Sequence, residues 1–81
     1  MSLVGVITGA SSGIGQALTV QLSNSYSTLY ICGRKLKSLQ LTKDMCSASK
    51  AEIIPILLDL NDKVSIKKAA VEIAEKDSKI H

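Results

Sequence analysis

The apolar residues of this chain fall into three short runs that alternate with three longer segments of helical period. The runs cover Leu3–Ile7, Thr28–Cys32 and Ile53–Leu58. Each run is rich in β-branched residues or leucine and is almost continuous, which is typical of parallel strands that are buried on both faces. The pattern therefore predicts three buried strands, each followed by a helix.

The segments after these runs carry apolar residues at helical spacing. The residues that define the three predicted helices are, in chain order, Ile14, Ala17, Leu18, Gln21 and Leu22; Leu36, Leu39, Leu41, Met45 and Cys46, within a helix from Leu36 to Ala48; and Ile66, Ala69, Ala70, Ile73 and Ala74. The second set has the loosest periodicity. Asn61 or Asp62 can cap the third helix, and Glu72 can pair with Lys76 one turn later.

Strand and helix thus alternate in the order βαβαβα, which implies a parallel sheet with right-handed crossovers. We predict the Rossmann-like half of a doubly wound α/β fold, with strand order 3-2-1. Pro55 supports this order, because proline lacks the N–H that a central strand needs and is tolerated on an edge strand. The 81 residues make one domain or part of one.

Composition and charge exclude several classes of protein. Ten basic and seven acidic residues give a net charge of +3, which is too small and too dispersed to indicate nucleic-acid binding. No apolar run approaches the ~18 residues that cross a membrane, and the first run lacks the basic region of a signal peptide. Cys32 and Cys46 match no metal or redox spacing. We expect a cytoplasmic protein with reduced thiols, no metal, and no membrane or nucleic-acid partner.

Three glycines, Gly9, Gly13 and Gly15, follow the first predicted strand. Glycine permits a tight turn and lets the backbone approach a pyrophosphate, whose charge suits the free N–H groups of a helix N-terminus. Ser11 and Ser12 add hydroxyl donors within the turn. A glycine loop by itself also fits an ordinary flexible turn between a strand and a helix.

Two further positions favour a cofactor site. The Rossmann pattern expects an acidic residue at the end of the second strand to bind the ribose hydroxyls of NAD. Here Gly33-Arg34-Lys35 occupies that place, and a guanidinium can pair bidentately with a 2′-phosphate, which favours NADP. Asp59 ends the third strand, so all these features lie where open α/β sheets bind ligands. Taken singly, Arg34 also fits a solvated helix start and Asp59 a helix-capping turn.

The sequence resembles the short-chain dehydrogenase/reductase family in three places. TGASSGIG resembles the family's TGxxxGxG cofactor loop, LYICGR the second strand of its NADP-preferring members, and LLDL the end of its third strand. The resemblance implies a set of NADP(H) contacts: Gly9, Gly13 and Gly15 shape the loop, the Ile14 N–H meets the pyrophosphate, Ser11 and Ser12 approach the adenosine ribose, Arg34 binds the 2′-phosphate, and Asp59 and Leu60 meet the adenine.

The residues of the family's chemistry are not found in this sequence. The resemblance implies an Asn-Asn-Ala-Gly segment, a serine and a Tyr-x-x-x-Lys pair, but neither Tyr26 nor Tyr30 is followed four residues later by lysine. Both tyrosines are interpreted as packing residues, and no catalytic or metal role is assigned to His81. We expect no catalytic residue in this chain.

Residues 1–81 are therefore interpreted as the N-terminal part of an NADP(H)-binding Rossmann domain that ends before a fourth strand. In complete members of the family, the resemblance implies hydride transfer between the nicotinamide and a carbonyl or alcohol substrate. The alternative is a non-catalytic nucleotide-binding or interaction module. Without a fourth strand the edge of Leu3–Ile7 stays open, so we expect self-association through that strand.

Overall fold

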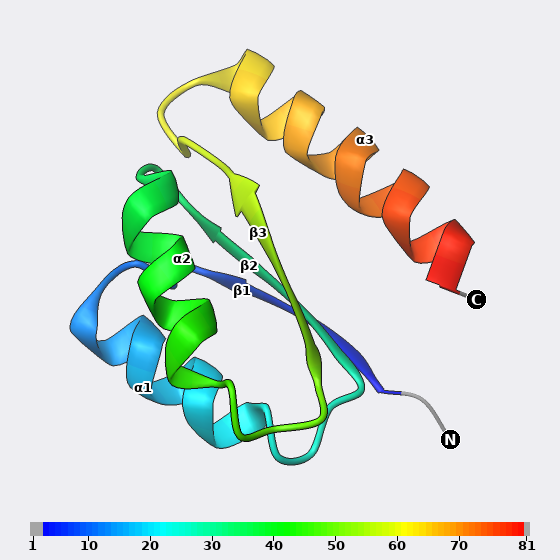
Figure 1. Ribbon diagram of the computed structural model, residues 1–81. Coiled ribbons are helices and arrows are strands. Elements are labelled where there is room, and N and C mark those ends of the chain that lie inside the picture. The colour runs from blue at the N-terminus through cyan, green and yellow to red at the C-terminus, as the bar shows by residue number, and fades with distance from the viewer. Residues whose placement is uncertain (1–2, 81) are drawn as a thin grey trace.

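The computed structural model describes residues 3–80, in which three parallel strands alternate with three helices (Figure 1). The elements are β1 (Val4–Thr8), α1 (Gly13–Leu22), β2 (Thr28–Gly33), α2 (Leu36–Met45), β3 (Glu52–Leu57) and α3 (Lys63–Ile80). The strands pair in the order β1-β2-β3. The predicted Rossmann-like α/β fold with strand order 3-2-1 is therefore confirmed, and each strand boundary lies within one residue of its predicted position.

Helices α1 and α2 cover one face of the sheet, and α3 covers the other (Figure 1). Successive residues of a strand point to opposite faces, so the sheet supports two separate apolar cores. The core under α1 and α2 includes Ile7, Ala10, Leu29, Ile31, Leu39, Cys46 and Ile53. The core under α3 includes Tyr30, Cys32, Ile56 and Ala69.

Strand β2 is buried at every position, because it has a strand on each side and a helix on each face. Strands β1 and β3 are the edges of the described sheet. Each of them exposes an apolar side chain by 53%, Val6 in β1 and Leu57 in β3. The prediction of burial on both faces is therefore right for β2 and wrong for β1 and β3, because an edge strand is only partly covered by its neighbours.

Pro55 lies in β3, at the edge of the sheet. The N–H groups of Glu52 and Leu58 donate to the carbonyls of Ser27 and Gly33, on the β2 side. Since alternate residues of a strand direct their N–H groups to opposite sides, the nitrogen of Pro55 falls on the open side, where no ladder bond is lost. The edge position predicted for this proline is confirmed.

Helix α1 turns a different face to the sheet from the one predicted. Its buried positions are Gly15 and Thr19, whereas Ile14 is 86% exposed and Leu18 is 45% exposed. The close approach at Gly15 explains this orientation, because a Cβ on that residue would lie 2.0 Å from the carbonyl oxygen of Gly9. The helix rests its glycine against the preceding loop. Ile14 and Leu18 point away from the sheet, whereas Val20 and the predicted Leu22 pack against the core.

Helix α2 also differs from the prediction. The predicted positions Leu39 and Cys46 are buried, but Leu36, Leu41 and Met45 are more than half exposed, and the second buried position within the helix is Thr42. A buried threonine is stable when its hydroxyl has a hydrogen-bond acceptor. Apolar spacing alone misses such a position.

Helix α3 follows its prediction in part. Ala69 and Ile73 pack into the core that contains Tyr30, whereas the other predicted positions, Ile66, Ala70 and Ala74, are exposed. Of the two predicted caps, Asp62 is the one that acts, because its Oδ1 accepts the Val64 N–H at 3.0 Å. The Lys76 ammonium lies 3.9 Å from the Glu72 carboxylate, as the i,i+4 spacing predicts.

Candidate cofactor-binding site

A cleft of about 470 Å³ lies where the carboxyl ends of the three strands meet. Its lining comes from the turn after β1, the end of β2 and the turn after β3: Thr8, Gly9, Ser11, Ser12, Cys32, Gly33, Arg34, Leu58, Asp59, Leu60 and Asn61. Parallel strands place all their carboxyl ends at one edge of the sheet. Segments that lie some 25 residues apart in the chain therefore become neighbours here.

Most of the residues predicted to contact a cofactor line this cleft. They are Gly9, Ser11, Ser12, Arg34, Asp59 and Leu60. The other three, Gly13, Ile14 and Gly15, do not line it but form the first turn of α1, which follows the loop directly. The remaining lining residues were not predicted as site residues. Each lies within two positions of one that was, so a wider window at each strand end would have found them.

The loop between β1 and α1 is tightly hydrogen-bonded. Gly9 has a φ of +67°, a conformation that residues with a side chain rarely adopt. Its carbonyl accepts bonds from Ser12, at 3.1 Å from the N–H and 2.8 Å from the hydroxyl. The Ser12 Oγ in turn accepts the Gly15 N–H at 3.2 Å and so caps α1. The loop thus has a defined shape, and the interpretation of it as a flexible turn is not supported.

The first turn of α1 leaves two backbone N–H groups for a ligand. Gly15 and Gln16 donate to the side chain and the carbonyl of Ser12. The N–H groups of Gly13 and Ile14 have no acceptor within residues 3–80. The positive end of the helix dipole lies at the same place, and this combination suits a phosphate group.

Arg34 and Asp59 place opposite charges on the cleft. Arg34 follows β2 and is exposed to solvent. Asp59 is held in a turn, in which its Oδ1 accepts the Asn61 N–H at 3.0 Å and its own N–H donates to the Ser65 hydroxyl at 2.9 Å. Asp59 thus lies in a turn before α3, but the residue that caps the helix is Asp62. Asp59 also lines the cleft.

Two buried acidic groups near the strands have raised pKa values. Burial raises the pKa of the Cys32 thiol to about 11, and the Glu72 carboxylate acts in the same direction. Burial also raises the pKa of Tyr30, with smaller contributions from the carboxylates of Asp77 and Glu52. Both groups stay protonated at neutral pH, so the Cys32 thiol is a poor nucleophile. Tyr30 is fully buried in the core, which confirms its interpretation as a packing residue.

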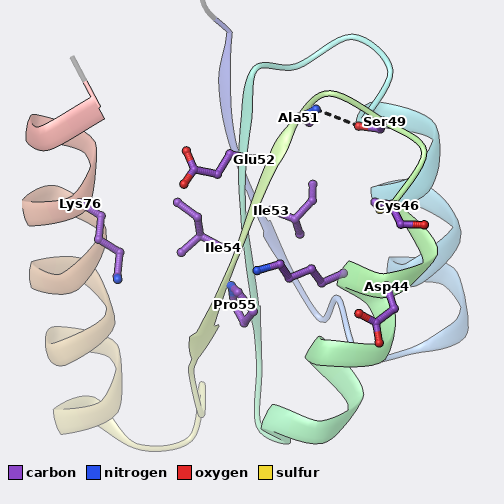
Figure 2. A pocket seen from close by; sticks show the side chains of 11 residues that line it. Asp44, Cys46, Ser49, Ala51, Glu52, Ile53, Ile54, Pro55 and Lys76 are labelled. Carbon is purple, nitrogen blue, oxygen red and sulfur yellow. Dashed lines mark hydrogen bonds between the residues drawn. The ribbon is translucent and has the colours of Figure 1, made fainter.

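A larger hollow, about 610 Å³, lies along the outer edge of β3 between α2 and α3 (Figure 2). Its rim mixes Lys43 and Asp44 of α2 with Lys76 of α3. Neither the glycine loop nor the start of α1 borders it. Because the hollow lacks the glycine loop and a helix N-terminus, we take the smaller cleft at the strand ends as the candidate site.

The described part of the chain holds neither a metal cluster nor a membrane-spanning helix. Residues 3–80 hold no cluster of His, Cys, Asp or Glu side chains that could bind a metal ion. Over the same residues, no helix is long and apolar enough to cross a membrane. His81 lies outside the described residues.

Known proteins resemble this chain over nearly its whole length. The sequence model of the family described as short chain dehydrogenase matches residues 4–81. The short-chain dehydrogenase/reductase iacJ of Pestalotiopsis fici is 39% identical over 81 residues, which cover 93% of this chain and 25% of that relative. The chain therefore spans about a quarter of the length of this curated relative.

Solved structures share the fold of this chain. An alcohol dehydrogenase from the archaeon Thermococcus sibiricus, complexed with 5-hydroxy-NADP, is similar with a TM-score of 0.85 at 26% identity, over 94% of this chain and 33% of that one. A metagenomic short-chain oxidoreductase in complex with NADP is similar with a TM-score of 0.83 at 26% identity, over 91% of this chain and 34% of that one.

Proposed function

This chain belongs to the short-chain dehydrogenase/reductase family, and we propose that it is the NADP(H)-binding portion of an oxidoreductase acting on a carbonyl or alcohol substrate. The observation that carries this proposal is the cleft at the strand ends, where the glycine loop, Arg34 and Asp59 come together. Residues 1–81 are proposed to be the N-terminal part of the nucleotide-binding domain. The NADP complexes of two similar structures support the choice of cofactor.

The pyrophosphate of NADP(H) is proposed to bind at the start of α1. The N–H groups of Gly13 and Ile14 have no acceptor in the described chain, so they are available to phosphate oxygens. Gly9 and Gly15 bring the loop and the helix close together, since a Cβ on Gly15 would collide with the Gly9 carbonyl. The residues present therefore fit the group that the family binds.

The adenosine half is proposed to lie in the cleft itself. Ser11 and Ser12 lie beside the ribose in this proposal, and Arg34 pairs with the 2′-phosphate. Asp59 and Leu60 meet the adenine; the turn uses one carboxylate oxygen of Asp59 and leaves the other for a ligand. When bound, the nicotinamide supplies the carbon that donates or accepts hydride, while these residues hold and orient the cofactor.

The choice of NADP(H) over NAD(H) can be tested with Arg34→Asp in the protein that contains this chain. A charge-assisted hydrogen bond to the 2′-phosphate predicts that the variant loses about tenfold or more of its preference for NADPH over NADH. The measurement is the dissociation constant of each cofactor by fluorescence titration. Lys37→Asp is the matched control, because Lys37 is exposed in the first turn of α2 and does not line the cleft. Equal preferences in the wild type and the Arg34 variant would assign Arg34 to the solvated surface.

Two further properties follow from the same interpretation. We propose that residues 1–81, produced alone, associate through the edge of β1, which pairs only with β2 among the described strands. We also propose a cytoplasmic location, because Cys32 and Cys46 are both free thiols.

A further inference from the structure

Thr42 makes a contact that neither its sequence spacing nor its helix explains. It lies in α2, is fully buried, and directs its hydroxyl to the carbonyl of Ala10 in the glycine loop at 2.9 Å. The same hydroxyl lies 3.1 Å from the carbonyl of Ser38, one turn earlier in α2. The bond to Ala10 joins residues that are 32 positions apart.

The hydrogen bond to the Ala10 carbonyl contributes more to stability than the contact with the Ser38 carbonyl. The Ser38 carbonyl already has the usual helical partner, the N–H four residues later. The Ala10 carbonyl receives no backbone N–H within residues 3–80. A buried carbonyl without a donor is costly, so the Thr42 hydroxyl satisfies a group that would otherwise stay unpaired.

Ala10 is held on both sides by other elements. Its N–H donates to the Cys32 carbonyl of β2 at 3.0 Å, and its carbonyl accepts from α2 through Thr42. The next residue, Ser11, lines the cleft and packs over Gly33, where a Cβ would lie only 2.9 Å from the Ser11 hydroxyl. A shift of Ala10 would therefore displace Ser11 from its place against Gly33.

We propose that Thr42 is a positioning residue for the cofactor loop. Its hydroxyl anchors Ala10 to α2, so that the loop already has its binding conformation before the cofactor arrives. The role rests on the proposed function, because it presumes that the loop binds NADP(H). Since Thr42 does not line the cleft, its loss should weaken NADPH and NADH equally, unlike the loss of Arg34.

The test compares Thr42→Val, which keeps the shape but removes the donor, with Thr42→Ser, which keeps the donor. We expect Thr42→Val to bind both cofactors about tenfold more weakly at an unchanged ratio, and Thr42→Ser to restore binding. Backbone amides 9–13 should exchange faster in the unliganded valine variant only. Thr28→Val is the control, because Thr28 is also buried but lies at the opposite end of β2.

Several outcomes would overturn the role of Thr42. One is a folded Thr42→Val protein that binds the cofactors and exchanges its loop amides as the wild type does. Another is a Thr42→Ser variant that binds the cofactors as weakly as Thr42→Val. If the valine variant does not fold, NMR of the wild type decides: a slowly exchanging Thr42 hydroxyl proton with a nuclear Overhauser effect to Ala10 supports the role, and its absence overturns it. A wild type that binds neither cofactor refutes the proposed function instead, while the exchange of the loop amides still tests Thr42.

Discussion

Gly15 is the residue at which the size of a side chain most directly limits the site. A Cβ there would lie 2.0 Å from the Gly9 oxygen and 2.9 Å from the Ala10 Cα, all backbone atoms that cannot rotate away. Gly13, two residues earlier in the same helix, has nothing within 4 Å of its Cβ position. The two glycines therefore form a matched pair in which only one is required by packing.

We predict that Gly15→Ala destabilises the protein by about 1–3 kcal/mol, because the loop must move to admit the methyl group. Gly13→Ala should be neutral or stabilising by up to about 1 kcal/mol, since alanine loses less backbone freedom on folding. Urea unfolding without cofactor measures both effects. Equal stabilities of the two variants would mean that α1 does not approach the loop as closely as described.

The raised pKa of Cys32 predicts that the stability of the chain depends on pH in the alkaline range. Its pKa is about 11 in the folded chain against an ordinary value of 9.0, so between these values the unfolded chain releases a proton that the folded chain keeps. Deprotonation therefore favours unfolding, and stability falls as pH rises through this window. The raised pKa of Tyr30 likewise lowers the stability of the folded chain as pH rises, but at higher pH.

Cys32→Ala should flatten this alkaline loss by up to about 3 kcal/mol, although the smaller side chain lowers stability at neutral pH. The measurement is the free energy of unfolding against pH, below and above the ordinary thiol pKa. Cys46→Ala is the matched control, because Cys46 is also a buried free thiol. Parallel pH profiles for the wild type and Cys32→Ala would show that the thiol titrates normally.

At the scale of the elements, the helices show how well apolar spacing alone predicts which side chains are buried. The periodicity of α2 correctly marked Leu39 and Cys46 as buried, but it also marked Leu36, Leu41 and Met45, which are exposed, and it missed the buried Thr42. A leucine can be exposed at modest cost, whereas the buried hydroxyl of Thr42 needs the acceptor that the glycine loop provides. The acceptor that the loop offers to Thr42 therefore accounts for a buried polar position that apolar spacing does not mark.

The two edge strands differ in how they limit further pairing. Pro55 removes an N–H from the open side of β3. In β1, Ser27 and Thr28 both donate to the Leu3 carbonyl, so alternation turns the peptide groups of Val4, Val6 and Thr8 to the open side. Residues 4–8 contain no proline and no charge to discourage pairing.

For the whole molecule this difference predicts self-association of residues 1–81, when they are produced alone, through β1. Val6→Lys should reduce the association measured by sedimentation at micromolar concentration, because a charged residue at an edge disfavours strand pairing. Leu57→Lys is the matched control: Leu57 is equally exposed, at 53%, but lies on the edge that Pro55 already interrupts. A monomeric wild-type chain, or equal effects of the two lysines, would contradict association through β1.

The sequence by itself determined the order of the elements, the strand order and the chemistry at the strand ends. These features depend on signals that are local along the chain. Apolar runs mark the buried strands, glycines at 9, 13 and 15 mark the loop, and a proline marks the edge strand. Because parallel strands bring their carboxyl ends together, local signals at Arg34 and Asp59 were enough to locate the cleft.

Only the tertiary structure decided which helix faces are buried and how the loop is held. On the inward side of α1 Gly15 lies against Gly9, and on the inward side of α2 Thr42 bonds to Ala10. Whether Asp59 serves a helix-capping turn or the cleft was open in the sequence. The structure places it on the cleft and in the turn before α3, and Asp62 caps that helix. Burial and hydrogen bonding between distant residues arise only when the elements pack, so no periodicity along the chain encodes them.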